Sequence, residues 1–445
     1  MKVVIVGGGA SGLLVALWFM RTGTNADTVV IIDDAQHVGE GAAYARLNDN
    51  YLLNVRAVGM SAYIDNLAHF VDWLRNAKDY HDAEGFVPRH WYAEYLRYEL
   101  AIQVQQSDVQ LVIHRGVVQH IDRTSHVVTC ADGKRYDADA VVMAIGNLAP
   151  QNPVRRWTTT PKRMVNWRDF RPDLVESGDT VIIVGTGLTM VDQLIALHGA
   201  GHYGQIIAIS RHGYLPSPHV ARQSYACPVT VDDAALPLSV LMRTMRIAIR
   251  HAQDAGVPWQ AVIDSVRPHT QEIWRRWDSR TQQRFMRHIR PIWDVHRHRM
   301  APEISLRVNQ MITAGQLHVI AGRIEGYEES HHGVQIDVCT QAERQSIRGA
   351  IVINCTGPAS DYVVDAVPVV QSLALQGAVI RHENGLGLLV NNVGQLVNAS
   401  GEVEPWLWCI GQMRKGVDWE CTAIPDIRVH AHQLVQALRI NERGQ

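Results

Sequence analysis

The sequence predicts an α/β protein built from two similar units, because one strand–turn–helix pattern occurs twice. The first copy follows the apolar run of residues 3–6 and reads Gly7-Gly8-Gly9-Ala10-Ser11-Gly12. The second follows the apolar run of residues 181–184, about 180 positions later, and begins Gly185-Thr186-Gly187. Such a turn directs backbone N–H groups and the positive end of a helix at a pyrophosphate. Two copies predict two Rossmann-like domains that hold two dinucleotides.

The composition is that of an ordinary globular protein and excludes several other classes. The 445 residues are 47% hydrophobic and 19% charged, and the chain is long enough for two domains. The net charge of −2 gives no field that attracts nucleic acid or an anionic membrane. The six cysteines contain no C-x-x-C pair, which fits a reducing compartment. The apolar run 3–20 is broken by glycines and lacks a basic n-region, so we expect a cytoplasmic protein without a signal peptide.

The first unit has the features of an FAD site. The predicted strand 29–33 ends in Asp33, about twenty positions after Gly12, where an acid binds a ribose hydroxyl. An acid at this position favours a free 2′-OH and repels a 2′-phosphate. The alternative is a plain βα turn in another α/β fold. We expect FAD contacts from Gly7, Gly9, Ala10, Ser11, Gly12, Asp33, Asp34, Gly41 and Gly146.

The second unit has the features of a nicotinamide dinucleotide site. The predicted strand 206–209 is followed by Ser210 and Arg211, so a cation stands where the first unit has Asp33. An arginine there suits a 2′-phosphate, which favours NADPH over NADH. The alternative is a vestigial domain that binds no nucleotide. We expect contacts from Gly185, Gly187, Thr189 and Arg211.

Helical periodicity between residues 232 and 315 predicts an insertion in the second unit. Its clearest helices are 238–249 and 271–289, and Pro291 should break or kink the second. The last strand, 406–411, and a helix from about 424 to 440 are expected to return to the first unit and cover the flavin. The predicted FAD domain is therefore 1–150 with 350–445, and the NAD(P)H domain is 160–350 with the insertion at 232–315.

Two side-chain clusters near the insertion have two interpretations each. The segment His296–Arg299 forms either a salt-bridged helix face or a contact with an anionic substrate or the nicotinamide phosphates. Its His-x-His spacing does not place both rings on one helix face, so no metal site is expected. Trp274, Trp277 and Trp293 either fill the core of the insertion or form a lid over a substrate cavity.

Several longer segments are more specific than the glycine turns. They are residues 51–55, 60–61, 86–89, 92–96, 185–192, 210–213, 293–299 and 419–425. Through these segments nearly the whole chain resembles bacterial FAD/NAD(P)-binding oxidoreductases that are distantly related to the two-dinucleotide-binding flavin monooxygenases. This group includes FAD-dependent urate hydroxylase-like proteins. The resemblance implies a glutathione-reductase-like FAD domain, an NAD(P) domain and the cofactors FAD and NADPH or NADH.

The chain departs from that family pattern at two positions. Most two-dinucleotide flavoproteins have Gly-Asp after the last strand, with the Asp on the ribityl chain, whereas this chain has Gly411-Gln412. In the second fingerprint Met190 replaces the third glycine, which leaves two glycines at the phosphate turn. We expect Gly411 and Gln412 to contact FAD, with the glutamine amide or a backbone group in place of the Asp side chain.

The resemblance implies an NAD(P)H-dependent FAD monooxygenase. In such an enzyme a peroxyflavin hydroxylates a small polar substrate, here with N-heterocycles among the candidates, so the partners would be this substrate and dioxygen. The candidate catalytic residues are Asn54 and Glu420. Asn54 either hydrogen-bonds a flavin ring atom or stabilises a turn. Glu420 either belongs to a segment whose backbone N–H groups stabilise negative charge at the flavin pyrimidine edge, or it caps the last helix. Thr422 and Ala423 of that segment are expected to contact the flavin. Two alternatives are an NAD(P)H:acceptor flavin reductase or dehydrogenase and a non-catalytic FAD-binding sensor.

Overall fold

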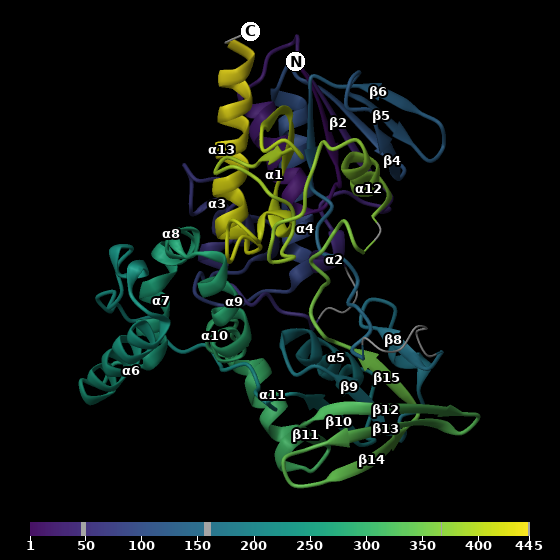
Figure 1. Ribbon diagram of the computed structural model, residues 1–445, viewed down its shortest axis with the longest axis vertical. Coiled ribbons are helices and arrows are strands. Elements are labelled where there is room, and N and C mark those ends of the chain that lie inside the picture. Colours follow the sequence, from purple (N-terminus) through teal and green to yellow (C-terminus); the bar gives the residue numbers. More distant parts are fainter. Residues whose placement is uncertain (46–49, 155–161, 366, 444–445) are drawn as a thin grey trace.

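The computed structural model describes residues 1–45, 50–154, 162–365 and 367–443 (Figure 1). The predicted NAD(P)H domain begins at residue 160 and the predicted FAD domain ends at residue 445. Residues 160, 161, 444 and 445 lie outside the described residues. Within the described part, no helix combines the length and the apolarity that crossing a bilayer requires.

The first unit is built on a six-stranded sheet of order β16-β17-β7-β1-β2-β3. All its pairings are parallel except that of β16 with β17. Its central strand is buried along residues 3–6, as expected for a parallel strand covered on both faces. The strands are β1 (Lys2–Val6), β2 (Thr28–Asp33), β3 (Gln110–Arg115), β7 (Ala140–Met143), β16 (Gln395–Val397) and β17 (Val403–Cys409).

Helices cover one face of this sheet, and a small meander with one helix covers the other. The first face carries α1 (Ala10–Thr22), α3 (His69–Lys78), α4 (Arg89–Gln106) and α13 (Ile424–Arg443), whose apolar residues form one core with β1. The second face carries β4 (Val118–Ile121), β5 (Val127–Cys130), β6 (Arg135–Asp137) and α12 (Pro368–Leu375). The short helix α2 (Gly41–Tyr44) contacts α4.

The second unit repeats this plan on a five-stranded parallel sheet of order β11-β10-β9-β15-β8. Its strand β9 precedes a glycine turn and helix α5 as β1 precedes α1, and a second meander stands between β11 and β15. The expected α/β fold with two Rossmann-like units is therefore confirmed. The elements are β8 (Met164–Asn166), β9 (Val181–Val184), α5 (Leu188–Gly199), β10 (Ile206–Ser210), β11 (Leu317–Ala321), β12 (Arg323–Ser330), β13 (Gly333–Cys339), β14 (Arg344–Gly349) and β15 (Ile351–Asn354).

The helical insertion lies beside the start of α13 (Figure 1) and has a core of its own. The single helix expected at 271–289 is two helices, because Asp278 caps a new one by accepting the Thr281 N–H. Pro291 stands in the first turn of a further helix. The helices are α6 (Leu238–Asp254), α7 (Trp259–Val266), α8 (Thr270–Arg276), α9 (Ser279–His288) and α10 (Arg290–Arg297).

Two expected boundaries differ from the structure. Helix α11 (Pro302–Thr313) was expected in the insertion, but its buried residues join the core of the second sheet, and it precedes β11 as a crossover helix. Strand β15 pairs with β9 and β8, so the chain returns to the first sheet after Asn354 rather than at 350.

Candidate functional site

The first glycine turn leaves no space for side chains at two of its positions. Gly7 has a φ of +108°, and a Cβ there would lie 2.3 Å from the Ala144 carbonyl oxygen. A Cβ on Gly12 would lie 2.0 Å from the Gly7 carbonyl oxygen. Both positions therefore require glycine, since the turn is held between the end of β7 and the start of α1.

The start of α1 is open to an anion. Gly9 is its N-cap and supplies no side-chain hydrogen bond, and the first turn holds no acidic residue. A Cβ on Gly9 would be 3.6 Å from the Gly41 Cα, and a Cβ on Gly411 would be 3.2 Å from the Ser11 hydroxyl oxygen. Three segments thus meet around free helix N–H groups with almost no side-chain bulk, which suits a pyrophosphate. We call this arrangement the FAD cradle.

The acid at the end of β2 is held next to the cradle. One Asp33 oxygen accepts the Gly8 N–H at 2.5 Å, and the other accepts the Ala35 N–H at 2.8 Å. Each carboxylate oxygen retains a lone pair for a ribose hydroxyl. The neighbouring Asp34 is exposed, while Gly146 follows β7 with a φ of +76° and open space above its Cα.

Gln412 provides a test of whether the cradle fits FAD. Its side chain is buried, and its Nε2 has no hydrogen-bond partner among the described residues. It follows Gly411, which lies against Ser11. A buried amide N–H without an acceptor costs about 1–3 kcal/mol. The ribityl hydroxyls of FAD would supply that acceptor, so the departure from the usual Gly-Asp keeps a polar group here and fits the cofactor.

The segment before α13 connects the FAD cradle to the insertion. The Cys421 thiol donates to the Gly411 carbonyl at 3.1 Å, which holds the segment against the cradle. Glu420 has a φ of +63°, a strained conformation for a residue other than glycine. Thr422 is exposed and Ala423 is half-buried immediately before the helix. The end of this segment therefore presents small, accessible residues at the start of α13.

The Glu420 side chain is bound by the insertion. Its two oxygens accept the Trp293 indole N–H at 2.6 Å and the Arg297 Nε–H at 2.9 Å. Burial alone would raise the pKa of Glu420, but Arg297 and His298 hold it below its ordinary value. The carboxylate is therefore ionised, and its described partners belong to the insertion.

The second glycine turn has the same geometry as the first, with one difference. Gly185 has a φ of +106°, and a Cβ there would lie 2.5 Å from the Cys355 carbonyl oxygen. Gly187 is the uncapped N-cap of α5, and Thr189 is half-buried in its first turn. Met190, where the first turn has Gly12, is fully buried in the core of the second unit. The start of α5 stays open as in the first turn. The difference is that a buried methionine, Met190, stands at the position of the third glycine.

Arg211 lies immediately after β10, on the side of the second turn. The Thr186 hydroxyl oxygen is 2.9 Å from the Ser210 hydroxyl and 2.6 Å from the Tyr214 carbonyl oxygen, which holds this loop against the turn. Arg211 is exposed and forms no ion pair within the described part of the chain. Its guanidinium is therefore accessible to a phosphate.

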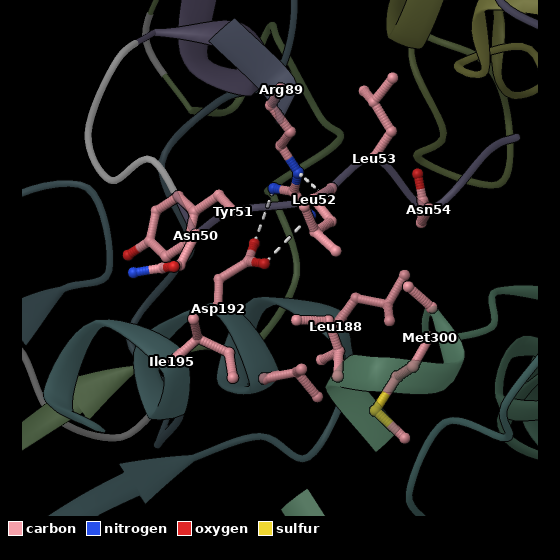
Figure 2. Close-up of a pocket in the computed structure, with 13 residues that line it drawn as sticks. Asn50, Tyr51, Leu52, Leu53, Asn54, Arg89, Leu188, Asp192, Ile195 and Met300 are labelled. Carbon is pink, nitrogen blue, oxygen red and sulfur yellow. Dashed lines mark hydrogen bonds and ion pairs between the residues drawn. The ribbon is translucent and has the colours of Figure 1, made fainter. Parts of the chain in front are cut away.

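The two units meet at an ion pair that the sequence did not indicate (Figure 2). The two Arg89 Nη atoms donate to the two Asp192 oxygens at 2.8 and 3.0 Å, and the Arg89 Nε donates to the Leu52 carbonyl at 2.9 Å. A pocket beside this pair is lined by residues 50–54 of the first unit and by α5 and α11 of the second. Both charged residues fall in the specific segments 86–89 and 185–192, but their pairing spans 103 positions.

Asn54 lies at the edge of this pocket (Figure 2). Its carbonyl oxygen is 3.0 Å from the His219 Nε2. Burial and the nearby Arg299 lower the pKa of His219 to about 4, so the ring is neutral and its Nε2–H donates. The backbone of Asn54 is thereby fixed to the loop before the insertion.

The segment His296–Arg299 is tied down by ion pairs and ring packing. Arg297 pairs with Glu420, and the buried Arg299 pairs with Asp264. The His296 ring packs edge-on against Trp259. Only His296 and Arg297 of this segment lie on α10, and the pair of Arg297 with Glu420 fits the salt-bridged interpretation, whereas His298 and Arg299 follow the end of the helix.

Ion pairs also hold the insertion against the C-terminal part of the first unit. The buried Asp418 accepts from Arg275 of α8 and, at 2.8 Å, from the Arg414 Nε. The Trp274 indole N–H donates to the Gly416 carbonyl at 2.7 Å. We call these contacts, together with those of Glu420, the insertion latch.

One group of potential metal ligands lies elsewhere in the first unit. His114, Cys130 and Asp132 place one ligand atom each within 4.8 Å of one another. The His114 Nε2 lies 3.3 Å from an Asp132 carboxylate oxygen, and burial raises the pKa of the Cys130 thiol. The thiol is therefore protonated, and the group lies on the edge strand β3, at the end of β5 and in the turn that follows β5.

Comparisons with known proteins agree with this architecture. A family model described as FAD-NAD(P)-binding matches residues 4–148, which confirms the expected cofactor class of the first domain. No curated protein sequence matches the chain. L-lysine 6-monooxygenase from Pseudomonas syringae has a similar structure, with a TM-score of 0.69, 13% identity and 99% of each chain covered.

Two further solved structures resemble the chain over its length. Ornithine N-hydroxylase KtzI from Kutzneria sp. 744, whose structure carries FADred, NADP+ and L-orn, has a TM-score of 0.66 at 13% identity, covering 100% of this chain and 99% of that chain. Bacillithiol disulfide reductase Bdr (YpdA) from Staphylococcus aureus has a TM-score of 0.61 at 12% identity, covering 100% and 99%. The chain therefore has the fold of the two-dinucleotide-binding flavoproteins, with an FAD-NAD(P)-binding domain at residues 4–148.

Proposed function

We propose that this protein is an NAD(P)H-dependent FAD monooxygenase that hydroxylates a small organic molecule, with N-heterocycles among the candidates. The observation that carries the proposal is the pair of equivalent glycine turns. In each turn a glycine with positive φ packs against the backbone at the end of a neighbouring strand, and the helix that follows starts without a side-chain cap. Two of the structurally similar proteins are named as a monooxygenase and an N-hydroxylase, which supports this reaction class.

The first unit would hold FAD and the second NADPH. The FAD pyrophosphate would lie at the start of α1, its ribose at Asp33 and its ribityl chain near Gln412. The NADPH pyrophosphate would lie at the start of α5, with its 2′-phosphate at Arg211. We therefore propose an FAD domain of residues 1–150 with the chain after 354, and an NAD(P)H domain of residues 160–354 that carries the insertion.

Bound FAD would accept a hydride from NAD(P)H and activate dioxygen. In the balanced reaction, substrate, dioxygen, NAD(P)H and a proton give hydroxylated substrate, NAD(P)+ and water. The residues of the chain position the reactants and exclude water. The pair Arg89–Asp192 sets the two units against each other, and the insertion latch closes the segment 415–423 over the cradle.

A flavin reductase is the second candidate. The similarity to a protein named as a bacillithiol disulfide reductase favours it. Such an enzyme would oxidise NAD(P)H and pass the electrons to an acceptor without inserting oxygen.

Isotope-labelled dioxygen separates the two candidates. The FAD-loaded protein is supplied with NADPH, labelled dioxygen and a panel of heterocycles that contains neutral ones such as quinoline as well as the urate anion, and the products are analysed by mass spectrometry. A monooxygenase transfers one labelled oxygen atom to a substrate. NADPH oxidation that yields only reduced acceptor or hydrogen peroxide across the panel contradicts the monooxygenase and favours the reductase.

A further inference from the structure

The helical insertion encloses a cavity whose walls include four tryptophans. The cavity and its mouth together span about 600 Å³. Helices α6 to α10 supply most of the wall, and Trp419 comes from the segment before α13. We call it the tryptophan cavity, and its largest side chains are Trp274, Trp277, Trp293, Trp419, Phe285 and Met245.

The walls of the tryptophan cavity are almost entirely apolar. None of the lining side chains in the described part of the chain is charged, and the Thr270 hydroxyl donates to the Val266 carbonyl at 3.2 Å. A charged amino acid would lose its hydration here without an ionic partner. An empty apolar cavity also forgoes the dispersion contacts of its walls, so a flat apolar molecule would stabilise it.

The polar groups of the wall do not face the tryptophan cavity, so its accessible lining is almost all carbon. Trp274 donates to Gly416, and Trp293 donates to Glu420. The Nε1 of Trp277 and of Trp419 have no hydrogen-bond partner among the described residues, and Trp419 is only 4% exposed. Both nitrogens are buried inside the wall, so a ligand in the cavity meets aromatic and aliphatic carbon.

The tryptophan cavity lies close to the FAD cradle. Trp419 is two residues before Cys421, whose thiol donates to Gly411, and Gly411 lies against Ser11 at the start of α1. One face of Trp419 is stacked on Trp274 at 4.9 Å between ring centroids. A molecule in the cavity therefore touches the same segment that covers the cradle.

We infer that the tryptophan cavity binds the substrate, and that this substrate is a neutral, planar aromatic molecule. Its ring would stack among the aromatic walls. The inference rests on the proposed function, because it takes the bound molecule to be the substrate of the flavin. It selects neutral aromatic molecules and excludes charged ones, among them lysine and ornithine.

Calorimetric titration of the FAD-loaded protein with three probes tests this inference. Quinoline and indole are planar aromatic molecules of similar size that are neutral at neutral pH, and L-ornithine is charged. We expect quinoline and indole to bind and L-ornithine not to bind. Tight binding of L-ornithine, or no binding of quinoline, would overturn the inference.

A substitution in the wall locates the binding. Leu241→Trp fills the cavity and should abolish binding of both probes. Val240→Trp, on the exposed side of the same helix, is its control and should leave binding intact. Unfolding temperatures show whether each variant is folded.

The outcomes separate this inference from the proposed function. Quinoline binding that survives Leu241→Trp places the ligand elsewhere and overturns the inference. If NADPH still reduces the bound FAD in that case, the proposed function stands. Failure of NADPH to reduce the FAD contradicts the proposed function even if quinoline binds in the cavity.

Discussion

Gly185 is the residue on which the second nucleotide site depends most. Alanine at this position would combine a φ of +106° with a Cβ 2.5 Å from a carbonyl oxygen. The strain of about 1–3 kcal/mol, if relieved by opening the turn, corresponds to a ~5- to 150-fold loss of affinity for the dinucleotide. We expect Gly185→Ala to retain FAD and to raise the NADPH concentration for half-maximal flavin reduction by that factor.

Gly315 provides the matched control for this substitution. It also has a positive φ, +72°, in the second unit, but a Cβ there meets nothing within 4 Å. Gly315→Ala should lower stability slightly and leave flavin reduction by NADPH unchanged. Equal effects of the two substitutions would show that the Gly185 turn has no special role.

Arg211 determines the choice between NADPH and NADH if it binds the 2′-phosphate. A charge-assisted hydrogen bond of about 1.5–3 kcal/mol corresponds to a ~10- to 100-fold change in affinity. We expect Arg211→Ala to raise the KM for NADPH by that factor and to change the KM for NADH little. Arg344→Ala, at an arginine that is 79% exposed in the same unit, is the control. An equal loss for both nucleotides would contradict the assignment.

His219 makes stability depend on pH. Its pKa is lowered to about 4 by burial and by Arg299, whereas in the unfolded chain it is about 6.5. Between these values the unfolded chain binds a proton that the folded chain does not, so the free energy of unfolding decreases as the pH falls. This residue should contribute roughly 1–3 kcal/mol over that window.

Denaturant titrations at several pH values measure the effect of His219. His219→Gln keeps a donor for the Asn54 carbonyl and removes the titrating group, so the free energy of unfolding should depend less on pH. His318→Gln, at an exposed histidine of β11, should leave the dependence unchanged. An unaltered dependence in His219→Gln would mean that other groups determine it.

At the scale of elements, the insertion latch determines whether the helical insertion stays against the first unit. Asp418 is fully buried and pairs with the fully buried Arg414 and with Arg275. Removing one partner from a buried ion pair costs about 3–5 kcal/mol, because a charge is left without compensation. We expect Asp418→Asn to destabilise the protein by that amount and to increase proteolysis of the insertion.

An exposed ion pair of the insertion is the control for the latch. Asp232 is 93% exposed and pairs with Arg276. Asp232→Asn should change stability by less than about 1 kcal/mol. If Asp418→Asn unfolds no more easily than Asp232→Asn, the latch does not hold the insertion in place.

The sequence predicts elements that are defined locally and misses those that depend on tertiary contacts. Both strand–turn–helix units were predictable, because the glycines of each turn directly follow an apolar strand. Helix α11 was assigned to the wrong part, since helical periodicity does not say which core a helix joins. The break at Asp278 carried a local capping signal that the apolar pattern around it obscured.

The same division applies to the candidate site. The glycine turns, Asp33 and Arg211 lie where the spacing placed them, at the ends of their strands. The pair Arg89–Asp192 and the tryptophan cavity join residues more than 100 positions apart, and no local pattern relates them. Glu420 was singled out in the sequence, but its two partners on the insertion appear only in the folded chain.

At the scale of the whole molecule, the proposed activity depends on electron transfer between the two units. Each unit has an open helix start, and the Arg89–Asp192 pair and the insertion latch hold the parts together. If both sites bind their dinucleotides, a hydride from the second unit must reach the flavin of the first.

Anaerobic mixing of the FAD-loaded protein with NADPH in a stopped-flow spectrometer tests this claim most directly. We expect the flavin absorbance to bleach, and to bleach faster with NADPH than with NADH. We also expect Gly185→Ala to slow the bleaching at low NADPH concentration, whereas Gly315→Ala should not. A flavin that stays oxidised with both nucleotides would contradict the account and favour a protein that binds FAD without catalysing its reduction.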